Sequence, residues 1–363
     1  MPVAEQRGGS EVMLRQLVEH TPGGGAHWLV IFLRDGPMVS ELRGLGAAVD
    51  VVEAGRLREP HRHVAALARI AGLAHRRRAD IIVGWMVKSQ LYAGPAAVLA
   101  GIPAVWYQLG VPSPCAWLDR AATALPAAGI IAVSESAARA QGRIAPHRPL
   151  RVVYPGIELD RFDPAQLPSP RETRAGLGLP LDGPLVGIVG RLQHWKGMHV
   201  LVAAMARIPG ARCVIVGGAH DLEPDYPAQL ERQILALGLT GRVTLAGLQS
   251  DVRLWMQAMD VVVHASDREP FGIVVLEAMA LGKPLVAGSA GGPREILSDG
   301  VDAVLAPFGN ADALARAIRR YLDDPDFARA AGAAARVRAA DFGVERFAHN
   351  VATAVSELAS VRR

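Results

Sequence analysis

Short apolar runs alternate with helical stretches along most of the chain, and this alternation constrains the fold more than any other feature. In the first half, helical stretches near 59–78, 87–100 and 135–141 separate apolar runs at Trp28–Leu33, Val49–Val52, Ile81–Val83, Ala104–Tyr107 and Ile130–Val133. In the second half, the runs lie at Leu185–Gly190, Cys213–Val216, Val243–Ala246, Val261–Ala265 and Leu285–Ala287. Strands that alternate with helices form parallel sheets with helices on both faces. We therefore predict an α/β fold with two doubly wound, Rossmann-like parallel-sheet domains.

A proline-rich stretch separates the two series. Its prolines are Pro155, Pro164, Pro168, Pro170, Pro180 and Pro184, with few apolar runs between them. This composition is typical of a linker, and a length of 363 residues suits two domains with a core each. We predict an N-terminal domain over 1–160, a linker over 161–183, a C-terminal domain over 184–342, and a terminal segment over 343–363 that contains a helix at Val344–Leu358.

The start of the chain lacks the strand that this fold requires. Residues 1–7 hold no apolar run, Gly8-Gly9-Ser10-Glu11 follow, and an amphipathic helix with Val12, Leu14, Leu17 and Val18 comes next. The glycine pair either lets a ligand approach the backbone or makes only a turn. A central strand contributes about 2 kcal/mol per large buried apolar side chain. We therefore expect that the first strand is missing from this sequence, because the true start lies upstream, because the chain is a fragment, or because Met1 is a mis-called initiator.

The composition is that of an intracellular globular protein. Hydrophobic residues make up 50% of the chain and charged residues 20%. No apolar run is long enough to span a bilayer, and no signal-peptide pattern opens the chain. The two cysteines, Cys115 and Cys213, lie far apart without metal-ligand spacing, which predicts free thiols in a reducing compartment. We expect a cytoplasmic protein.

The formal charge of +4 and the pI of about 9.4 indicate a modest basic excess. Such an excess suits phosphate-bearing ligands or an anionic membrane surface, and it does not indicate nucleic acid. The run His75–Arg78 ends a helix that begins near Pro60. Its cations either stabilise the C-terminal end of the helix dipole or bind a membrane surface. We expect no nucleic-acid partner and leave open a peripheral contact with the inner face of the membrane.

Two carboxylates mark the loop and helix after the run Val261–Ala265. Glu269 lies in the loop, and Glu277 lies about one turn into a helix over Ile273–Leu281. In open α/β sheets, ligands bind beyond the carboxyl ends of the strands, and a helix N-terminus there binds anions. Glu277 is the only ionisable residue of an otherwise apolar helix, so its carboxylate needs hydrogen-bond donors. An internal Arg, a helix N-terminus or a ligand can supply them.

A pair of cations follows the first apolar run of the second half. Arg191 ends that run, and Lys196 comes shortly before a helix that extends to about Arg207. A bidentate guanidinium and an ammonium at the end of one strand can converge on a diphosphate without a metal. No Asp-x-Asp motif lies in a strand-end loop. We therefore predict a diphosphate site at Arg191 and Lys196 and no metal.

Four motifs together resemble the family 4 glycosyltransferases: the Gly8-Gly9-x-Glu11 loop, Gly190-Arg191 with Lys196-Gly197, Glu269-x7-Glu277, and the turn Gly291-Gly292-Pro293. These are retaining nucleotide-sugar transferases of the GT-B fold, in which two Rossmann-like domains face a cleft. The resemblance covers essentially the whole chain and is strongest from about 184 to 345. It implies transfer of a hexosyl unit from a nucleotide sugar, with a UDP- or GDP-sugar as the expected donor and no further cofactor. The implied acceptor is a saccharide or a lipid-linked acceptor in the synthesis of a cell-surface polysaccharide or glycolipid.

The resemblance also implies roles for individual residues. Arg191 and Lys196 would hold the donor diphosphate, Glu269 would bond the hydroxyls of the donor sugar, and these three would carry catalysis. Glu277 would bind the ribose. Further donor contacts would come from Phe271, Gly272, Ile273 and Val274 at the helix start, from Gly8 and Gly9, and from Leu248 to Val252 beside the base. The C-terminal helix would cross back to the N-terminal domain.

One position departs from the family. Members often carry a His near the end of the fourth N-domain strand, where this chain has Gln108. Gln donates and accepts hydrogen bonds but cannot shuttle a proton, which puts an acid-base role there in doubt. The alternative is therefore a non-catalytic nucleotide-sugar-binding subunit of a polysaccharide assembly complex. The Glu-x7-Glu motif disfavours an epimerase or phosphorylase, and the lack of Gly-x-Gly-x-x-Gly after a strand disfavours a nicotinamide-dependent dehydrogenase.

Overall fold

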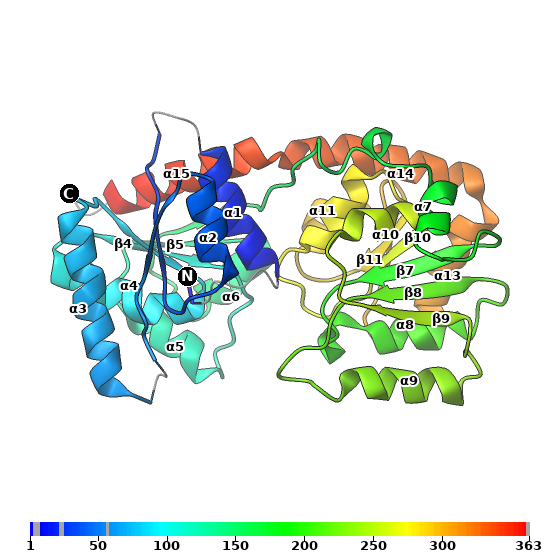
Figure 1. The fold of residues 1–363 in the computed structure, drawn as a ribbon, viewed down its shortest axis with the longest axis horizontal. Helices are drawn as coiled ribbons and strands as arrows, with labels where there is room; N and C mark the ends of the chain where they lie inside the picture. The colour runs from blue at the N-terminus through cyan, green and yellow to red at the C-terminus, as the bar shows by residue number, and fades with distance from the viewer. Residues whose placement is uncertain (3–7, 22–24, 56–57, 361–363) are drawn as a thin grey trace. The chain divides into compact units, whose positions relative to one another are not determined.

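The chain divides into two units in a computed structural model that describes residues 1–2, 8–21, 25–55 and 58–360 (Figure 1). Unit 1 contains Met1–Gly156 and Val344–Arg363, and unit 2 contains Ile157–Gly343. The stretch 161–183, expected as a linker, therefore lies within unit 2. The last helix of the chain lies in unit 1.

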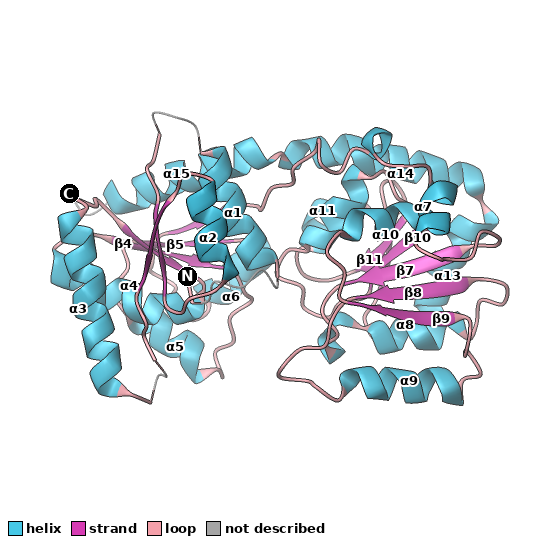
Figure 2. Cartoon of the chain, viewed as in Figure 1, coloured by secondary structure: helices cyan, strands magenta, loops and turns pink. Residues whose placement is uncertain are grey.

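Unit 1 is built from parallel strands with helices beside them (Figure 2). Its elements are α1 (Gly9–His20), β1 (Leu29–Phe32), α2 (Pro37–Gly44), β2 (Ala48–Val51), α3 (Pro60–Arg76), β3 (Ile82–Trp85), α4 (Val87–Ala100), β4 (Ala104–Gln108), α5 (Trp117–Ala124), β5 (Gly129–Ala132), α6 (Glu135–Gly142), β6 (Leu150–Val152) and α15 (Val344–Ser360). Strands β3, β4, β5 and β6 form one sheet in that order, and β1 pairs with β2 in another. Strands β4 and β5 are buried along their whole length, as apolar runs without alternation predict for a sheet covered on both faces.

The two sheets of unit 1 are not joined by any strand of the described residues. Residues 3–7, part of the opening segment in which no strand was expected, lie outside those residues. The backbone of Met1 bonds beside β1, with its amino group donating to the carbonyl of Ile31 (2.9 Å) and its carbonyl accepting from the amide of Leu33 (3.0 Å). The expectation of an upstream segment stays a prediction.

Unit 2 has a six-stranded parallel sheet in the order β12-β11-β10-β7-β8-β9. Its elements are η1 (Pro164–Gln166), α7 (Pro170–Gly176), β7 (Leu185–Val189), η2 (His194–Lys196), α8 (Met198–Met205), β8 (Arg212–Val216), α9 (Tyr226–Ala236), β9 (Val243–Gly247), α10 (Val252–Ala258), β10 (Val261–His264), α11 (Ile273–Ala280), β11 (Leu285–Gly288), α12 (Pro293–Ile296), β12 (Val304–Ala306), α13 (Ala311–Asp323), α14 (Pro325–Ala339) and η3 (Ala340–Phe342). The prediction of two Rossmann-like parallel-sheet domains is confirmed.

The proline-rich stretch at the start of unit 2 holds a helix of its own. Helix α7 begins with a capping box, in which the side chain of Ser169 accepts from the amide of Glu172 and the side chain of Glu172 accepts from the amide of Ser169. Pro170 occupies the first helical turn, where its missing amide hydrogen has no helical partner to lose. Buried Arg174 then bonds Asp260 at 2.7 Å, which fastens α7 to unit 2.

Helix α15 completes the core of unit 1. It packs against α1, β4 and β5 through a buried face that includes Phe347, Val351 and Leu358. A glycine begins β5, and a Cβ atom at Gly129 would lie 2.5 Å from a methyl carbon of Leu358. The last helix of the chain is thus fitted closely to a central strand of unit 1.

Candidate active site

The strand order of unit 2 reverses direction between β7 and β10. The chain proceeds from β7 through β8 to β9 on one side, and from β10 through β11 to β12 on the other. Ligands of doubly wound sheets bind beyond the carboxyl ends of the strands at such a reversal. The loops that follow β7 and β10 carry Arg191, Lys196 and Glu269.

These two loops are packed against each other by close backbone contacts. Gly197 has a φ of 76°, and a Cβ atom there would lie 2.1 Å from the carbonyl oxygen of Ala265. The amide of Asp267 donates to the carbonyl of Trp195 at 2.8 Å. A glycine at 197 therefore lets the turn that carries Lys196 meet the loop that carries Glu269.

Lys196 and Glu269 form a close ion pair. The ammonium of Lys196 donates to Oε2 of Glu269 at 2.6 Å, and the two side chains are only 15% and 10% exposed. The ring nitrogen Nε2 of His264 lies 3.1 Å from the same oxygen. Burial by itself raises the pKa of Glu269, but the charge of Lys196 and the contact with His264 outweigh it and hold that pKa well below its ordinary value. Glu269 is thus a nearly buried carboxylate that stays ionised.

Glu277 lies on α11 in a different environment. Burial raises its pKa to about 7, against a smaller opposing effect of the Arg161 charge. Among the described residues, its carboxylate accepts no hydrogen bond from protein. Of the three partners that the sequence left open for this carboxylate, an Arg is present as a nearby charge that forms no ion pair with it among the described residues, and its oxygens keep hydrogen-bonding capacity.

The loop before α11 is supported by the glycine turn after β11. Gly272, with a φ of 102°, caps the helix, and buried Phe271 precedes it. A Cβ atom at Gly291 would lie 2.4 Å from the carbonyl oxygen of Glu269, and one at Gly292 would lie 2.3 Å from Cα of Phe271. The amide of Gly292 donates to the carbonyl of Glu269 at 2.9 Å. The loop thus presents the first turn of α11, where Ile273 and Val274 are partly exposed.

The other predicted donor residues of unit 2 lie at neighbouring strand ends. Arg191 is exposed and forms no ion pair within the described part of the chain. Leu248 follows β9 and is 81% exposed, and a Cβ atom at Gly218 would lie 3.2 Å from its Cβ. Val252 begins α10 and is partly buried.

Three predicted residues belong to unit 1. Gly8 caps α1 and Gly9 begins it, and both keep solvent exposure. Gln108 ends β4, is 2% exposed, and accepts from the amide of Gly110 at 3.2 Å. The structure therefore brings Lys196 and Glu269 together in unit 2 and places Gly8, Gly9 and Gln108 in the other unit.

Sequence reasoning assigned no role to His264 or Arg161. The signal for His264 is its position, because an ionisable residue ends the buried strand Val261–His264 directly before the loop of Glu269. Arg161 lies in the proline-rich stretch, where no residue was expected to bear on the site. Its effect on Glu277 could not be found without coordinates.

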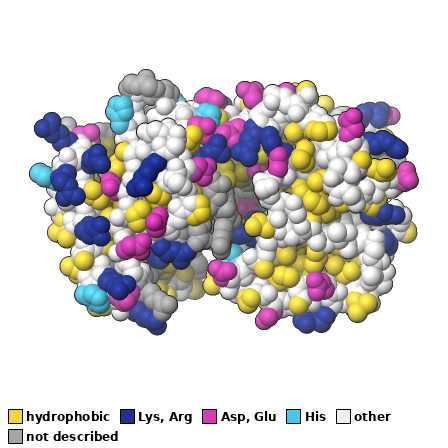
Figure 3. All heavy atoms as spheres, viewed as in Figure 1, with side chains coloured by type: hydrophobic (Ala, Val, Ile, Leu, Met, Phe, Trp, Pro, Cys, Tyr) yellow, Lys and Arg dark blue, Asp and Glu magenta, His cyan; other side chains and the backbone are white. Residues whose placement is uncertain are grey.

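The basic run His75–Arg78 belongs to unit 1. His75 and Arg76 occupy the last turn of α3, and Arg77 lies 3.7 Å from Asp50. These positions favour the interpretation that the cations stabilise the C-terminal end of the helix dipole. Figure 3 shows basic and acidic side chains interspersed over the face that it draws.

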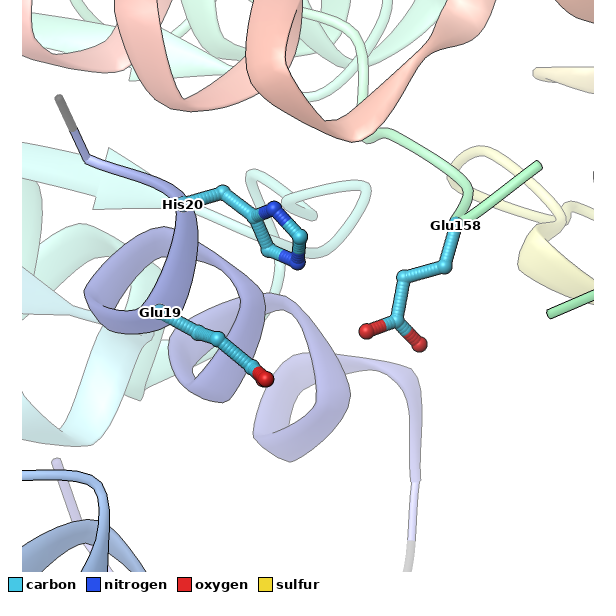
Figure 4. Close-up of side chains that lie close together, drawn as sticks. All are labelled: Glu19, His20 and Glu158. Carbon is cyan, nitrogen blue, oxygen red and sulfur yellow. The ribbon is translucent and has the colours of Figure 1, made fainter. Parts of the chain in front are cut away.

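A second cluster, Glu19, His20 and Glu158, is drawn in Figure 4. The first two residues end α1 in unit 1 and the third belongs to unit 2, so they define no site within either unit. In the described residues, no helix is long and apolar enough to cross a membrane.

Comparisons with known proteins find glycosyltransferases in both halves of the chain. Residues 170–338 match the family model "Glycosyl transferases group 1", and residues 7–161 match "Glycosyltransferase Family 4". The D-inositol 3-phosphate glycosyltransferase of Mycobacterium leprae is 39% identical over 219 residues, which is 58% of this chain and 48% of the relative. The lipopolysaccharide core biosynthesis glycosyltransferase LpsE of Rhizobium meliloti is 37% identical over 151 residues, which is 42% of this chain and 43% of that protein. The chain spans about half the length of these curated relatives.

Solved structures extend the likeness to the whole chain. Anabaena Alr3699/HepE, solved in complex with UDP-glucose, is 29% identical with a TM-score of 0.87, and the match covers 98% of each chain. The fold is therefore GT-B, and each half of the chain matches a glycosyltransferase family model.

Proposed function

We propose that this chain is a retaining glycosyltransferase that moves a hexosyl unit from a UDP- or GDP-sugar to a saccharide or lipid-linked acceptor, in the synthesis of a cell-surface polysaccharide or glycolipid. The observation that carries the proposal is the nearly buried Lys196–Glu269 pair at the reversal of the strand order. A cation and an ionised carboxylate there suit a ligand with a diphosphate at one end and sugar hydroxyls at the other.

The cations and the helix N-terminus would bind the diphosphate. Exposed Arg191 offers a bidentate guanidinium, Lys196 offers the hydrogens not used by Glu269, and the first turn of α11 offers backbone amides from Gly272 onward. Stabilising the charge that develops on the leaving diphosphate is the main catalytic task in such a transfer. Because protein cations perform it, turnover would need no divalent metal.

The two carboxylates would bind the two sugars of the donor. Oε2 of Glu269 is taken by Lys196 and His264, so Oε1 remains to accept a hydroxyl of the hexosyl unit. No group among the described residues donates a hydrogen bond to the Glu277 carboxylate, and the ribose hydroxyls would supply two donors. The base would lie by Leu248 and Val252.

Retention at the anomeric carbon is proposed without a covalent sugar intermediate. Glu269 is held by Lys196 at 2.6 Å and serves here as an acceptor for sugar hydroxyls rather than as a nucleophile. The acceptor would then attack the face that the diphosphate leaves. Gly8, Gly9 and Gln108 of unit 1 are proposed to act on the side of the reacting sugar. The known neighbours support a nucleotide sugar as substrate, since HepE is solved with UDP and with UDP-glucose.

The test uses purified chain with UDP-, GDP- and ADP-sugars, with and without a chelator. Thermal shift identifies the donor, because a ligand at 100 times its Kd stabilises a protein by about 2.7 kcal/mol. Nucleotide release measures turnover, and NMR of the product gives its anomeric configuration. We expect a chelator-insensitive reaction with retention. A chain that binds a nucleotide sugar but turns none over with any acceptor would instead be the non-catalytic subunit, and a chain that binds none would refute both functions.

A further inference from the structure

His264 is a buried imidazole that ends the central strand β10. The residue is 4% exposed, and β10 is paired on both sides, with β7 and with β11. Strand residues with locked neighbours hold a functional group more exactly in place than loop residues do. The ring therefore occupies one of the most rigid positions of unit 2.

The hydrogen bonds of His264 converge on the site. Its Nε2 lies 3.1 Å from Oε2 of Glu269 and 3.1 Å from Oγ of Ser266. An ionised carboxylate only accepts hydrogen bonds, so Nε2 carries the hydrogen that it shares. The other ring nitrogen, Nδ1, is buried and has no hydrogen-bond partner among the described residues.

The unpaired Nδ1 would be unfavourable if the His264 ring served only to fill the core. A buried polar atom without a partner is costly, whereas a valine or leucine would continue the run Val261–Val263 without that cost. His264 also lines a small pocket at the ends of β10, β11 and β12. The contact with Glu269 is what the imidazole provides and an apolar residue cannot.

Lys196 alone does not fix Glu269 once a donor is bound. Among the described residues, Lys196 is the one Lys or Arg that forms an ion pair with that carboxylate, and in the function proposed above its ammonium also serves the diphosphate. When it turns toward the phosphates, its 2.6 Å bond to Oε2 is weakened, and the His264 bond to the same oxygen remains. The donor then meets a carboxylate whose Oε1 still points to the sugar.

We infer that His264 is a positioning residue that holds Glu269 through its Nε2–H while Lys196 engages the donor diphosphate. The inference rests on the proposed function. Ser266, at 3% exposure, keeps the ring from rotating away by accepting from the same hydrogen. The role belongs to the reaction rather than to folding, so it should act on kcat more than on the donor KM.

The experiment compares His264→Leu, which removes the donor, with His264→Gln, whose amide can donate from a similar distance. Tyr321→Phe is the matched control, because it removes another buried hydrogen bond of unit 2, from the Tyr321 hydroxyl to the carbonyl of Leu285 (3.1 Å). The assay is UDP release from UDP-glucose, or from the sugar nucleotide on which the wild type is most active. Melting temperature is measured on every variant.

We expect His264→Leu to lower kcat about 10- to 100-fold, the scale of a misplaced catalytic group, with the donor KM within threefold. His264→Gln should restore most of kcat, and Tyr321→Phe should change melting but not kcat. If His264→Leu does not fold, His264→Asn replaces it, since its amide is polar but too short to reach Glu269.

Three results overturn the inference. A folded His264→Leu chain with kcat within twofold of wild type refutes the positioning role and leaves the proposed function intact. The same conclusion follows if Gln and Leu lose activity equally. A wild-type chain that turns over no sugar nucleotide refutes the proposed function, and the role falls with it.

Discussion

Replacing Lys196 with Met removes the cation on Glu269 and leaves a nearly buried carboxylate. The pair is 15% and 10% exposed, so solvent can do little to stabilise the remaining charge. Removing one partner of a buried pair costs about 3–5 kcal/mol. The ammonium also lies 4.1 Å from the centre of the Trp195 ring, and loss of that contact adds about 0.5–1 kcal/mol. We expect the free energy of unfolding of unit 2 to fall by about 3.5–6 kcal/mol at pH 7.

The pH dependence separates the ion pair from other effects. In the wild type, the folded pKa of Glu269 lies below its ordinary value of 4.5, so the stability that it contributes is present above pH 4.5 and is lost as the pH falls. In Lys196→Met, burial is opposed by His264 alone, and we expect the folded pKa to rise above 4.5. The cost of the bare carboxylate is then relieved by protonation as the pH falls. The difference between the two proteins should therefore shrink from pH 7 to pH 4.

Arg191→Met is the matched control, because Arg191 is an exposed cation of the same proposed site without an ion pair in the described residues. Both variants should bind UDP about 10- to 100-fold more weakly, since a charge-assisted hydrogen bond contributes about 1.5–3 kcal/mol. Only Lys196→Met should lose stability. Urea-dependent hydrogen exchange of the β7 and β10 amides reports on unit 2 itself. Equal stability of the two variants at pH 7, or a difference that does not change down to pH 4, would refute the reasoning.

Three further predictions follow from the site. Glu277→Gln should stabilise the chain by about 1–3 kcal/mol at pH 8 and much less at pH 5, because the cost of a carboxyl with a raised pKa grows as the pH rises from 4.5 to about 7, while UDP binding should weaken; equal melting shifts at both pH values would contradict this. Gly292→Ala should abolish turnover, because its new methyl group would collide with Cα of Phe271. Gly176→Ala, with open space around it, should change neither activity nor melting temperature. An active Gly292→Ala chain would show that the loop tolerates the shift. Glu269→Ala should lower turnover about 100-fold or more in a folded chain, and a normal transfer rate would remove Glu269 from the reaction.

The second half of the fold could be predicted because its strands are short apolar runs separated by helical stretches. Strands β7, β8, β10 and β11 lie where Leu185–Gly190, Cys213–Val216, Val261–Ala265 and Leu285–Ala287 predicted them. Helix α7 was not predicted, since six prolines in that stretch outweighed the capping signal of Ser169 and Glu172. Proline in the first turn favours a helix, whereas proline elsewhere disfavours one. Pro170 lies in the first turn of α7, so it supports this helix rather than opposing it.

The candidate site could be predicted residue by residue but not contact by contact. Nothing in the sequence states that β7 lies beside β10, so the bond from Lys196 to Glu269 across 73 positions required the sheet order. The sequence also does not show that Glu269 and Glu277 have opposite pKa shifts, because both residues follow the same strand. Their neighbours set them apart: Lys196 holds the pKa of Glu269 low, and burial raises the pKa of Glu277 to about 7.

The docking of α15 on unit 1 has a consequence for how the chain is made. Unit 1 is discontinuous: its strands are translated first, but the helix that covers β4 and β5 follows the whole of Ile157–Gly343. At about 5–20 residues per second, the ribosome takes many seconds to cross that interval. Unit 2 is contiguous and has every strand it needs once residue 343 has emerged. We therefore expect the order of folding to reverse the order of synthesis. Unit 2, which is translated second, should reach its native state while unit 1 still exposes the surface that Leu358 will cover.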